Sequence, residues 1–291
     1  MSLQDKEEAS LALGGQALVE GVMMRSRTHV VMCVRQPNNE LLTHKEKIDS
    51  VSGRHRILRL PLLRGIVALF ETLYLGFKGI YFSANAMLDE EEKFSYKEFV
   101  VAIGLALALA SLFFLGPFFL TTLFGLTGWL FNVVEAVMRL AIFLCYLTLI
   151  SMWGEIRRVL QYHGAEHKTI NAYEAGVKLN VANVKEYSRL HPRCGTSFIF
   201  IVVIVAILLF SLMPDLGFVV RLAYRLLLIP VIGAISYELL KLSGKHRRSI
   251  VTRILTAPGV AFQRLTTREP TDDMIEVAIE AVKEVNRLDD S

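Results

Sequence analysis

The chain has 291 residues, of which 53% are hydrophobic and only 21% are charged, and its formal net charge is +4. This composition is too apolar for an ordinary soluble enzyme or a disordered chain, so it indicates a membrane protein before any domain count. The three cysteines are widely scattered and suggest no disulfide framework.

Long apolar runs predict four membrane-spanning helices. The first run holds no charged residue and is long enough, as a helix, to cross a hydrocarbon core of about 30 Å. Short turns join the runs in pairs, and the four cover residues 99–124, 127–154, 197–213 and 218–240. We therefore expect a mainly α, polytopic helical membrane protein with four spans in two hairpins and a small β-containing N-terminal cytosolic segment.

Charged residues interrupt the second and the fourth of these runs. Glu135 and Arg139 are spaced i, i+4 in the second run, so they can neutralise each other inside a helical bundle. Arg221 and Arg225 lie in the fourth run. Because charges at membrane depth are functional by default, one possible function is a transporter or channel in which these side chains line a path.

The distribution of lysine and arginine predicts the orientation. The turns 125–128 and 214–217 contain neither residue, whereas the segments 154–196 and 241–268 are rich in both. Since lysine and arginine accumulate on the cytoplasmic side of a membrane, we expect a multi-pass protein with the 154–196 loop and the C-terminus in the cytosol.

The chain before the first span carries both strand and helix signals. Residues 28–46 alternate loosely in polarity around a Pro-Asn-Asn turn and predict a β-hairpin. Further on, Arg64, Glu71 and Lys78 recur at a seven-residue spacing on one stripe of an otherwise apolar helix. Such a helix lies in the membrane interface or enters the bilayer with that stripe against protein. If it spans the membrane, the N-terminal segment moves to the other side.

The sequence His163-Gly-Ala-Glu166-His167 is a metal-site pattern. On a helix starting near Tyr162 the two histidines lie one turn apart on one face, so both imidazoles can reach one ion. Glu166 sits at the edge of that face as a proton carrier, in the order found in inverted zinc peptidases. Glu174 returns to the same face as an outer contact of the ion.

A second pair of ligands follows in His191-Pro192-Arg193-Cys194. Together with the helix histidines, His191 and Cys194 would form a nitrogen and sulfur set, which favours zinc over magnesium or calcium. If Cys194 is not a ligand, a position stays open for water, which is the catalytic arrangement. We expect a divalent metal, zinc by preference, with Glu166 as general base and Arg193 as a contact for an anionic substrate group.

Four more charged residues are candidates to support this site from a distance. Glu238 lies in Ser-Tyr-Glu near the cytoplasmic end of the last span, and Glu20, Arg64 and Glu71 could approach from the N-terminal segment. An ordinary structural role explains each of them equally well.

Apolar residues at helical spacing over 271–288 predict an amphipathic cytosolic helix at the end of the chain. The expected organisation is an N-terminal cytosolic segment with a β-hairpin (1–56), an amphipathic interfacial or re-entrant helix with an acidic linker (57–98), a first membrane hairpin (99–153), a cytosolic metal-site loop (154–196), a second membrane hairpin (197–240), and a basic anchor with the amphipathic helix (241–291).

The leading functional hypothesis is metal-dependent hydrolysis of a peptide or lipid-linked substrate at the cytoplasmic face. There are two alternatives. One is a non-catalytic scaffold that has a structural metal site and holds partners through the C-terminal helix. The other is the transporter or channel. Membrane lipid is the expected partner. Nucleic acid is not an expected partner, because the basic run 245–248 directly follows a membrane helix and suits anionic lipid. The sequence leaves open whether the protein forms a homo-oligomer.

Four motifs in this order resemble the YqhQ-like family of bacterial membrane proteins, over about residues 12 to 270. They are Gly-Gly-Gln-Ala-Leu-Val-Glu-Gly-Val-Met-Met-Arg (14–25), Tyr-His-Gly-Ala-Glu-His-Lys (162–168), His-Pro-Arg-Cys-Gly-Thr-Ser (191–197) and Ser-Tyr-Glu (236–238). That family has been described only as predicted metal-dependent enzymes of unknown function. The resemblance implies a bacterial inner (cytoplasmic) membrane location and a metal site made of His163, Glu166, His167, His191 and Cys194. It supplies no substrate.

Overall fold

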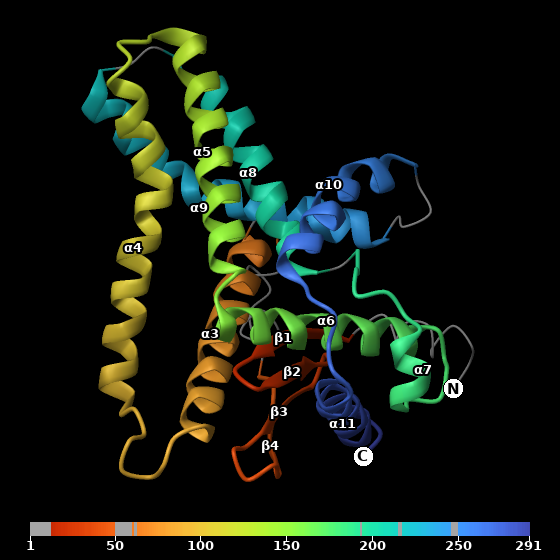
Figure 1. Cartoon of the computed structure of the whole chain (residues 1–291). Coiled ribbons are helices and arrows are strands. Elements are labelled where there is room, and N and C mark those ends of the chain that lie inside the picture. Colours follow the sequence, from red (N-terminus) through yellow and green to blue (C-terminus); the bar gives the residue numbers. More distant parts are fainter. Residues whose placement is uncertain (1–12, 50–59, 61–62, 193, 215–216, 246–249) are drawn as a thin grey trace.

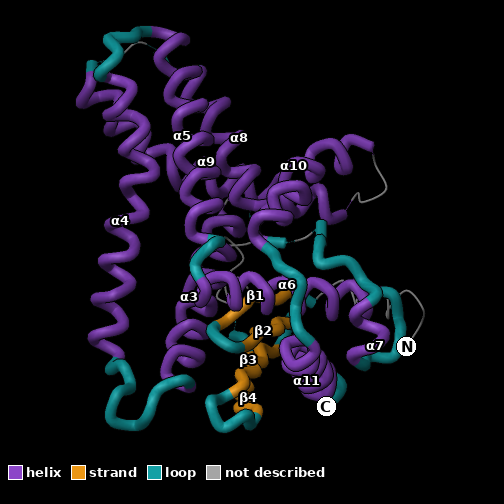
Figure 2. Tube along the Cα trace, viewed as in Figure 1, coloured by secondary structure: helices purple, strands orange, loops and turns teal. Residues whose placement is uncertain are grey.

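The structure is a computed structural model that describes residues 13–49, 60, 63–192, 194–214, 217–245 and 250–291. The described chain has two regions (Figure 1), a bundle of long helices and a smaller region in which helices surround a sheet. Figure 2 shows that the strands gather below the bundle.

The sheet is antiparallel, and in the described part of the chain its order is β1-β2-β3-β4. The strands are β1 (Gly14–Leu18), β2 (Gly21–Arg25), β3 (His29–Arg35) and β4 (Leu41–Lys47). The β3–β4 hairpin turns through Asn39, whose φ of 69° lies in the left-handed region that asparagine tolerates. The predicted hairpin over 28–46 is confirmed, and β1 and β2 extend it on the β3 side.

Helices cover both faces of the sheet, which explains why β2 and β3 are apolar almost without interruption. Val22 and Val31 point into a core shared with the helices on one face, whereas Met23 and Met32 point into a second core on the other. The helices are α6 (Gly154–Glu174) and α11 (Asp272–Asp289) on the first face and α3 (Leu63–Ala86) on the second.

The apolar runs form two helical hairpins, as the sequence predicts. They are α4 (Tyr96–Thr122) with α5 (Gly128–Ile150), and α8 (Gly195–Ser211) with α9 (Phe218–Lys245). A capping box between Ser95 and Glu98 starts α4, since each satisfies a backbone N–H of the other.

Within the residues that the structure describes, four helices are long and apolar enough to cross a membrane, and they indicate a membrane protein. These are α3, α4, α5 and α9, so the set differs from the expected one. The third expected span, residues 197–213, forms α8, which has 17 residues and extends about 26 Å at 1.5 Å per residue.

The helix α3 is long enough to span, yet its contacts place it beside the sheet. At its start Gly65 packs against Tyr237 of α9, and further along Gly76 lies against Gln16 of β1 and Gly79 against Leu18. The sheet also packs on α6 and α11, which follow the first hairpin and the whole bundle in sequence. The N-terminal strands therefore lie at the same end of the bundle as α6 and α11.

The last helix, α11, is amphipathic as expected, and its apolar face is buried, including Met274, Ile275, Ala278 and Val282. That face packs on the sheet of its own chain. It is therefore not the open partner surface that the scaffold hypothesis requires. In the part of the chain that the structure describes, two further helices are α7 (Val181–Lys185) and α10 (Ile250–Thr266).

Candidate metal centre

The helix α6 carries the first metal-site motif and lies across the base of the bundle, between it and the sheet (Figure 1). It begins at Gly154, earlier than the expected start near Tyr162, so the motif occupies its middle. The rings of His163 and His167 face each other edge to face, with centroids 4.4 Å apart. The predicted placement of both histidines on one helix face is confirmed.

Each of these histidines is oriented by a backbone carbonyl. His163 Nδ1 lies 2.7 Å from the carbonyl oxygen of Thr266, and His167 Nδ1 lies 2.7 Å from that of Arg189. Because a carbonyl only accepts hydrogen bonds, Nδ1 must be the protonated nitrogen of each ring. In the neutral imidazole the lone pair is then on Nε2, the atom directed into the cluster, as in metal-binding histidines.

A cysteine and a carboxylate face the two Nε2 atoms. Cys194 Sγ lies 3.1 Å from His163 Nε2, and one donor atom from each of His163, His167 and Cys194 lies within 4.8 Å of the others. Glu166 Oε2 lies 3.5 Å from His167 Nε2 and 4.0 Å from His163 Nε2. Among the described residues, His163, His167 and Cys194 form the group that has the spacing of a metal site.

The fourth predicted ligand, His191, lies beside this group. Its ring centroid is 5.8 Å from that of His167, and its Nε2 lies 3.6 Å from Glu174 Oε1. Gln263 of α10 holds the backbone of His191 with two hydrogen bonds, accepting from its N–H at 2.8 Å and donating to its carbonyl at 2.7 Å. The structure therefore brings together three of the four predicted ligands, and pairs His191 with Glu174.

The cluster is shielded from water. His167 is 1% exposed and Glu166 is 4% exposed. Burial lowers the pKa of His167, the hydrogen bond with Cys194 opposes this effect, and the nearby ring of His163 adds to it. A neutral His167 is the form that binds a metal ion.

The glycine-rich N-terminal motif reaches the cluster through β1. A Cβ on Gly15 would lie 2.5 Å from Glu166 Oε1, so only glycine lets the strand come this close to the carboxylate. On the opposite face of β1, the amide of Gln16 lies against Gly76 of α3. The predicted approach of the N-terminal segment to the site is thus made by the Gly15 backbone.

The other charged candidates pair with one another or with α6. Glu20 accepts hydrogen bonds from Arg158 and, at 3.3 Å, from the Tyr162 hydroxyl. Arg64 donates to Glu238, and Arg25 lies 3.9 Å from Glu71. These pairs link the β1–β2 turn, β2, α3, α6 and α9, so each has a structural contact. Arg193 lies outside the described residues.

Sequence reasoning missed the groups that orient the histidines. The carbonyls of Thr266 and Arg189 come from the end of α10 and from the loop after α7, and a backbone carbonyl has no sequence signature. Gln263 is a fully buried amide on α10, and the sequence does not reveal this burial.

The charged residues of the bundle form a second polar group. Arg139 and Arg225 both donate to Oε1 of Glu135, with Arg139 at 2.5 Å. The guanidinium of Arg225 also lies 4.7 Å from the centroid of the Phe118 ring. The predicted neutralisation of Glu135 by Arg139 is confirmed, with Arg225 as an additional partner.

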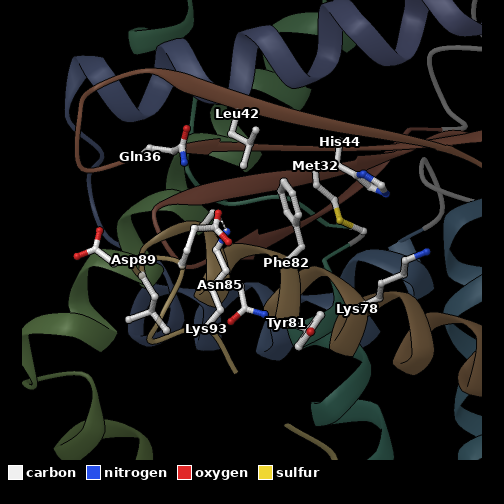
Figure 3. A pocket seen from close by; sticks show the side chains of 13 residues that line it. Met32, Gln36, Leu42, His44, Lys78, Tyr81, Phe82, Asn85, Asp89 and Lys93 are labelled. Atoms are coloured by element: carbon white, nitrogen blue, oxygen red, sulfur yellow. Dashed lines mark hydrogen bonds and ion pairs between the residues drawn. The ribbon is translucent and has the colours of Figure 1, made fainter. Parts of the chain in front are cut away.

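A cavity of about 460 Å³ opens on the other face of the sheet, between β3, β4 and the end of α3 (Figure 3). Met32, His44 and Phe82 line it, and the rings of His44 and Phe82 are 5.4 Å apart. The sheet separates this cavity from the histidine cluster on α6.

Comparison with known proteins gives a family without a known activity. A family model described as "Protein of unknown function (DUF1385)" matches residues 60–288. The "Uncharacterized protein YqhQ" of Bacillus subtilis (strain 168) is 36% identical over 302 residues, which cover 98% of this chain and 95% of the relative. No solved structure matches the chain. The family resemblance that the four motifs suggested is confirmed.

Proposed function

We propose that this chain, which belongs to the DUF1385 family of proteins of unknown function, is a membrane-embedded metal-dependent hydrolase. One observation carries the proposal. One donor atom from each of His163, His167 and Cys194 lies within 4.8 Å of the others, while both Nδ1 atoms are directed to carbonyls. Oriented donors of this kind are a feature of metal sites, whereas ordinary surface histidines need no such support.

The donor set favours zinc. His163, His167 and Cys194 supply two nitrogens and one sulfur, which suit zinc and not magnesium or calcium. Three protein ligands leave a fourth tetrahedral position for water or substrate, as in catalytic zinc sites. A divalent ion held there would supply Lewis-acid activation of water and of the group under attack.

Glu166 is the residue that would move the proton. Its Oε2 lies within 4.0 Å of both Nε2 atoms, so it borders the position that the three ligands leave open. A carboxylate there can accept the proton that water loses and deliver it to the leaving group. His191 and Glu174 lie beside this group and would form the adjacent part of the site.

We place the reaction at the cytoplasmic face of the bacterial inner membrane. The lysine- and arginine-rich segments flank the same end of the bundle as α6, and the turns at the other end contain neither residue. The substrate class that suits this location is a membrane-associated peptide or a lipid-linked molecule, with bilayer lipid as the surrounding partner.

A closed structural metal site is the second candidate, and the position of Glu166 is what favours it. If Glu166 Oε2 bound the ion as a fourth ligand, the site would have no open position. The ion would then link α6 to the Cys194 turn and have a structural role.

The Glu166→Gln variant separates the two functions. Glutamine keeps the shape but cannot accept the proton, so the hydrolase should keep its metal and lose about 100-fold or more of its rate. The measurement is zinc content together with hydrolysis of a panel of fluorogenic peptides, lipid esters and lipid phosphoesters by the full chain in detergent.

The matched control is Glu155→Gln, an exposed acid in the first turn of the same helix, which should change neither quantity. A fully metallated wild type that hydrolyses nothing in the panel would exclude the hydrolase. Loss of the metal in Glu166→Gln, with an inactive wild type, would establish the structural site instead.

A further inference from the structure

The strand β1 forms one edge of the sheet. Among the described residues no strand pairs with its outer side, and Gly14 and Gly15 are exposed. An open strand edge presents a row of backbone N–H and C=O groups, which are complementary to another extended chain.

The register shows which peptide groups face outward. β1 pairs with β2 from Leu18 opposite Gly21 to Gly14 opposite Arg25, so a two-residue loop joins the strands. In such a hairpin the pair next to the loop exchanges hydrogen bonds, and hydrogen-bonded and non-bonded pairs then alternate. The outward peptide groups on β1 are therefore those of Gly15 and Ala17.

The outward edge lies beside the candidate site. Gly15 is the residue whose missing Cβ would meet the Glu166 carboxylate, and that carboxylate lies 3.5 Å from His167 Nε2. A chain hydrogen-bonded to Gly15 would therefore pass next to the group that we assign as general base. On its other side the edge borders a cavity of about 330 Å³, lined in part by Gln16, Arg25 and Thr72, which can accept side chains of the added strand.

We propose that the substrate of this site is a polypeptide, bound in extended form as an added strand on the edge of β1. The inference rests on the proposed hydrolase function and narrows its substrate from a peptide or lipid-linked molecule to a peptide. Alternating donors and acceptors at the Gly15 and Ala17 edge match a peptide backbone, whereas a lipid ester has no N–H to offer.

The reaction is then hydrolysis of a peptide bond. The oxygen of water bonds to the scissile carbonyl carbon and the C–N bond breaks. The proton that water releases passes through Glu166 to the departing amine nitrogen, so one peptide and one water give one carboxyl and one amino terminus.

The test compares two compounds that both bind a metal ion through a hydroxamate group. Acetohydroxamate reports on the metal alone, and a leucine-rich tripeptide hydroxamate adds a backbone that can pair with β1. For the full-length, zinc-loaded chain in detergent, we expect the tripeptide hydroxamate to bind about tenfold more tightly, measured by calorimetry.

Two changes should remove this gain. Methylation of the peptide nitrogens of the tripeptide abolishes its donors without touching the protein. Ala17→Pro removes one outward N–H from the strand, a position at an edge where proline is tolerated. Both should leave acetohydroxamate binding unchanged, and Gly154→Ala, at the first residue of α6, where a Cβ meets nothing within 4 Å, is the control variant.

The outcomes are separable. If acetohydroxamate binds and the tripeptide hydroxamate gains nothing, or keeps its gain after N-methylation, the strand-edge proposal is wrong while the metal site stands. If neither compound binds a folded chain supplied with zinc, the proposed function itself fails.

Discussion

At Gly164, α6 lies against the backbone of the segment that follows α10. A Cβ at this position would overlap the carbonyl oxygen of Arg268, whose N–H in turn donates to the Leu160 carbonyl at 2.8 Å. Because the obstacle is hydrogen-bonded backbone, it cannot rotate away as a side chain can. The same segment carries the Thr266 carbonyl that orients His163.

Gly164→Ala should therefore lower both stability and metal affinity. Overpacking of this kind costs about 1 to 3 kcal/mol, which thermal unfolding in detergent would detect as a fall in Tm. The shift of the 266–268 segment should also weaken zinc binding, measured by competition with a chelator. Gly154→Ala, on the same helix with open space around it, should change neither. An unaltered zinc affinity in Gly164→Ala would show that the Thr266 contact does not support the site.

At this scale the sequence predicted those parts of the site that depend on local spacing. The interval between His163 and His167 is one helical turn in any helix, so their common face followed from the sequence alone. Cys194 also lies where it was expected. The pairing of His191 with Glu174 depends on how the loop meets α10, and the carbonyl contacts depend on the backbone path; neither has a local pattern.

A buried charged contact links α5 to α9. Glu135 accepts from Arg139 on its own helix and from Arg225 on α9, and all three side chains are buried. A single carboxylate thus compensates two guanidinium groups in an environment of low dielectric. Removing one member of such a buried group leaves uncompensated charge, which is far more costly than loss of a surface pair.

Glu135→Gln should destabilise the bundle by about 3 kcal/mol or more. The expected readout is a lower Tm of the detergent-solubilised protein. The double variant Glu135→Gln, Arg225→Gln should recover part of the loss, because it also removes one of the stranded charges. Glu91→Gln, an exposed acid in the loop before α4, is the control. If the single variant unfolds like the wild type, the carboxylate does not hold α5 to α9.

The hydrophobic pattern of the sequence predicted where the helices lie. The amphipathic pattern of 271–288 indicated α11 almost to the residue, and hydropathy located both hairpins. The sequence could not predict which helix packs on the sheet. Gly76 and Gly79 are the small residues of α3 that let it approach β1, but in the sequence they are ordinary members of an apolar run. The 17 residues of α8 equal the length of the predicted run 197–213, and the helix begins two residues earlier, immediately after Cys194.

In the whole molecule, the candidate site lies where the bundle meets the sheet region. Helix α6 supplies two histidines and the carboxylate, Cys194 directly precedes α8, and α10 closes the site through Gln263 and Thr266. The strand β1 brings the N-terminal motif to the same place. Segments that are far apart in sequence thus meet at one small cluster, which explains why three of the four motifs occur at such distant positions. The fourth motif, 236–238, contacts α3 instead, through Tyr237 and Glu238.

The central claim is that this cluster binds one metal ion, and metal content tests it most directly. The full chain would be purified without affinity metals, and its metals would be measured by inductively coupled plasma mass spectrometry for the wild type, His163→Ala, Cys194→Ser and the control His44→Ala, whose exposed histidine lies on β4. We predict about one zinc per chain in the wild type and in the control, and its loss in the two cluster variants. A folded wild type that takes up no zinc or other divalent ion, or cluster variants that retain it, would contradict the account.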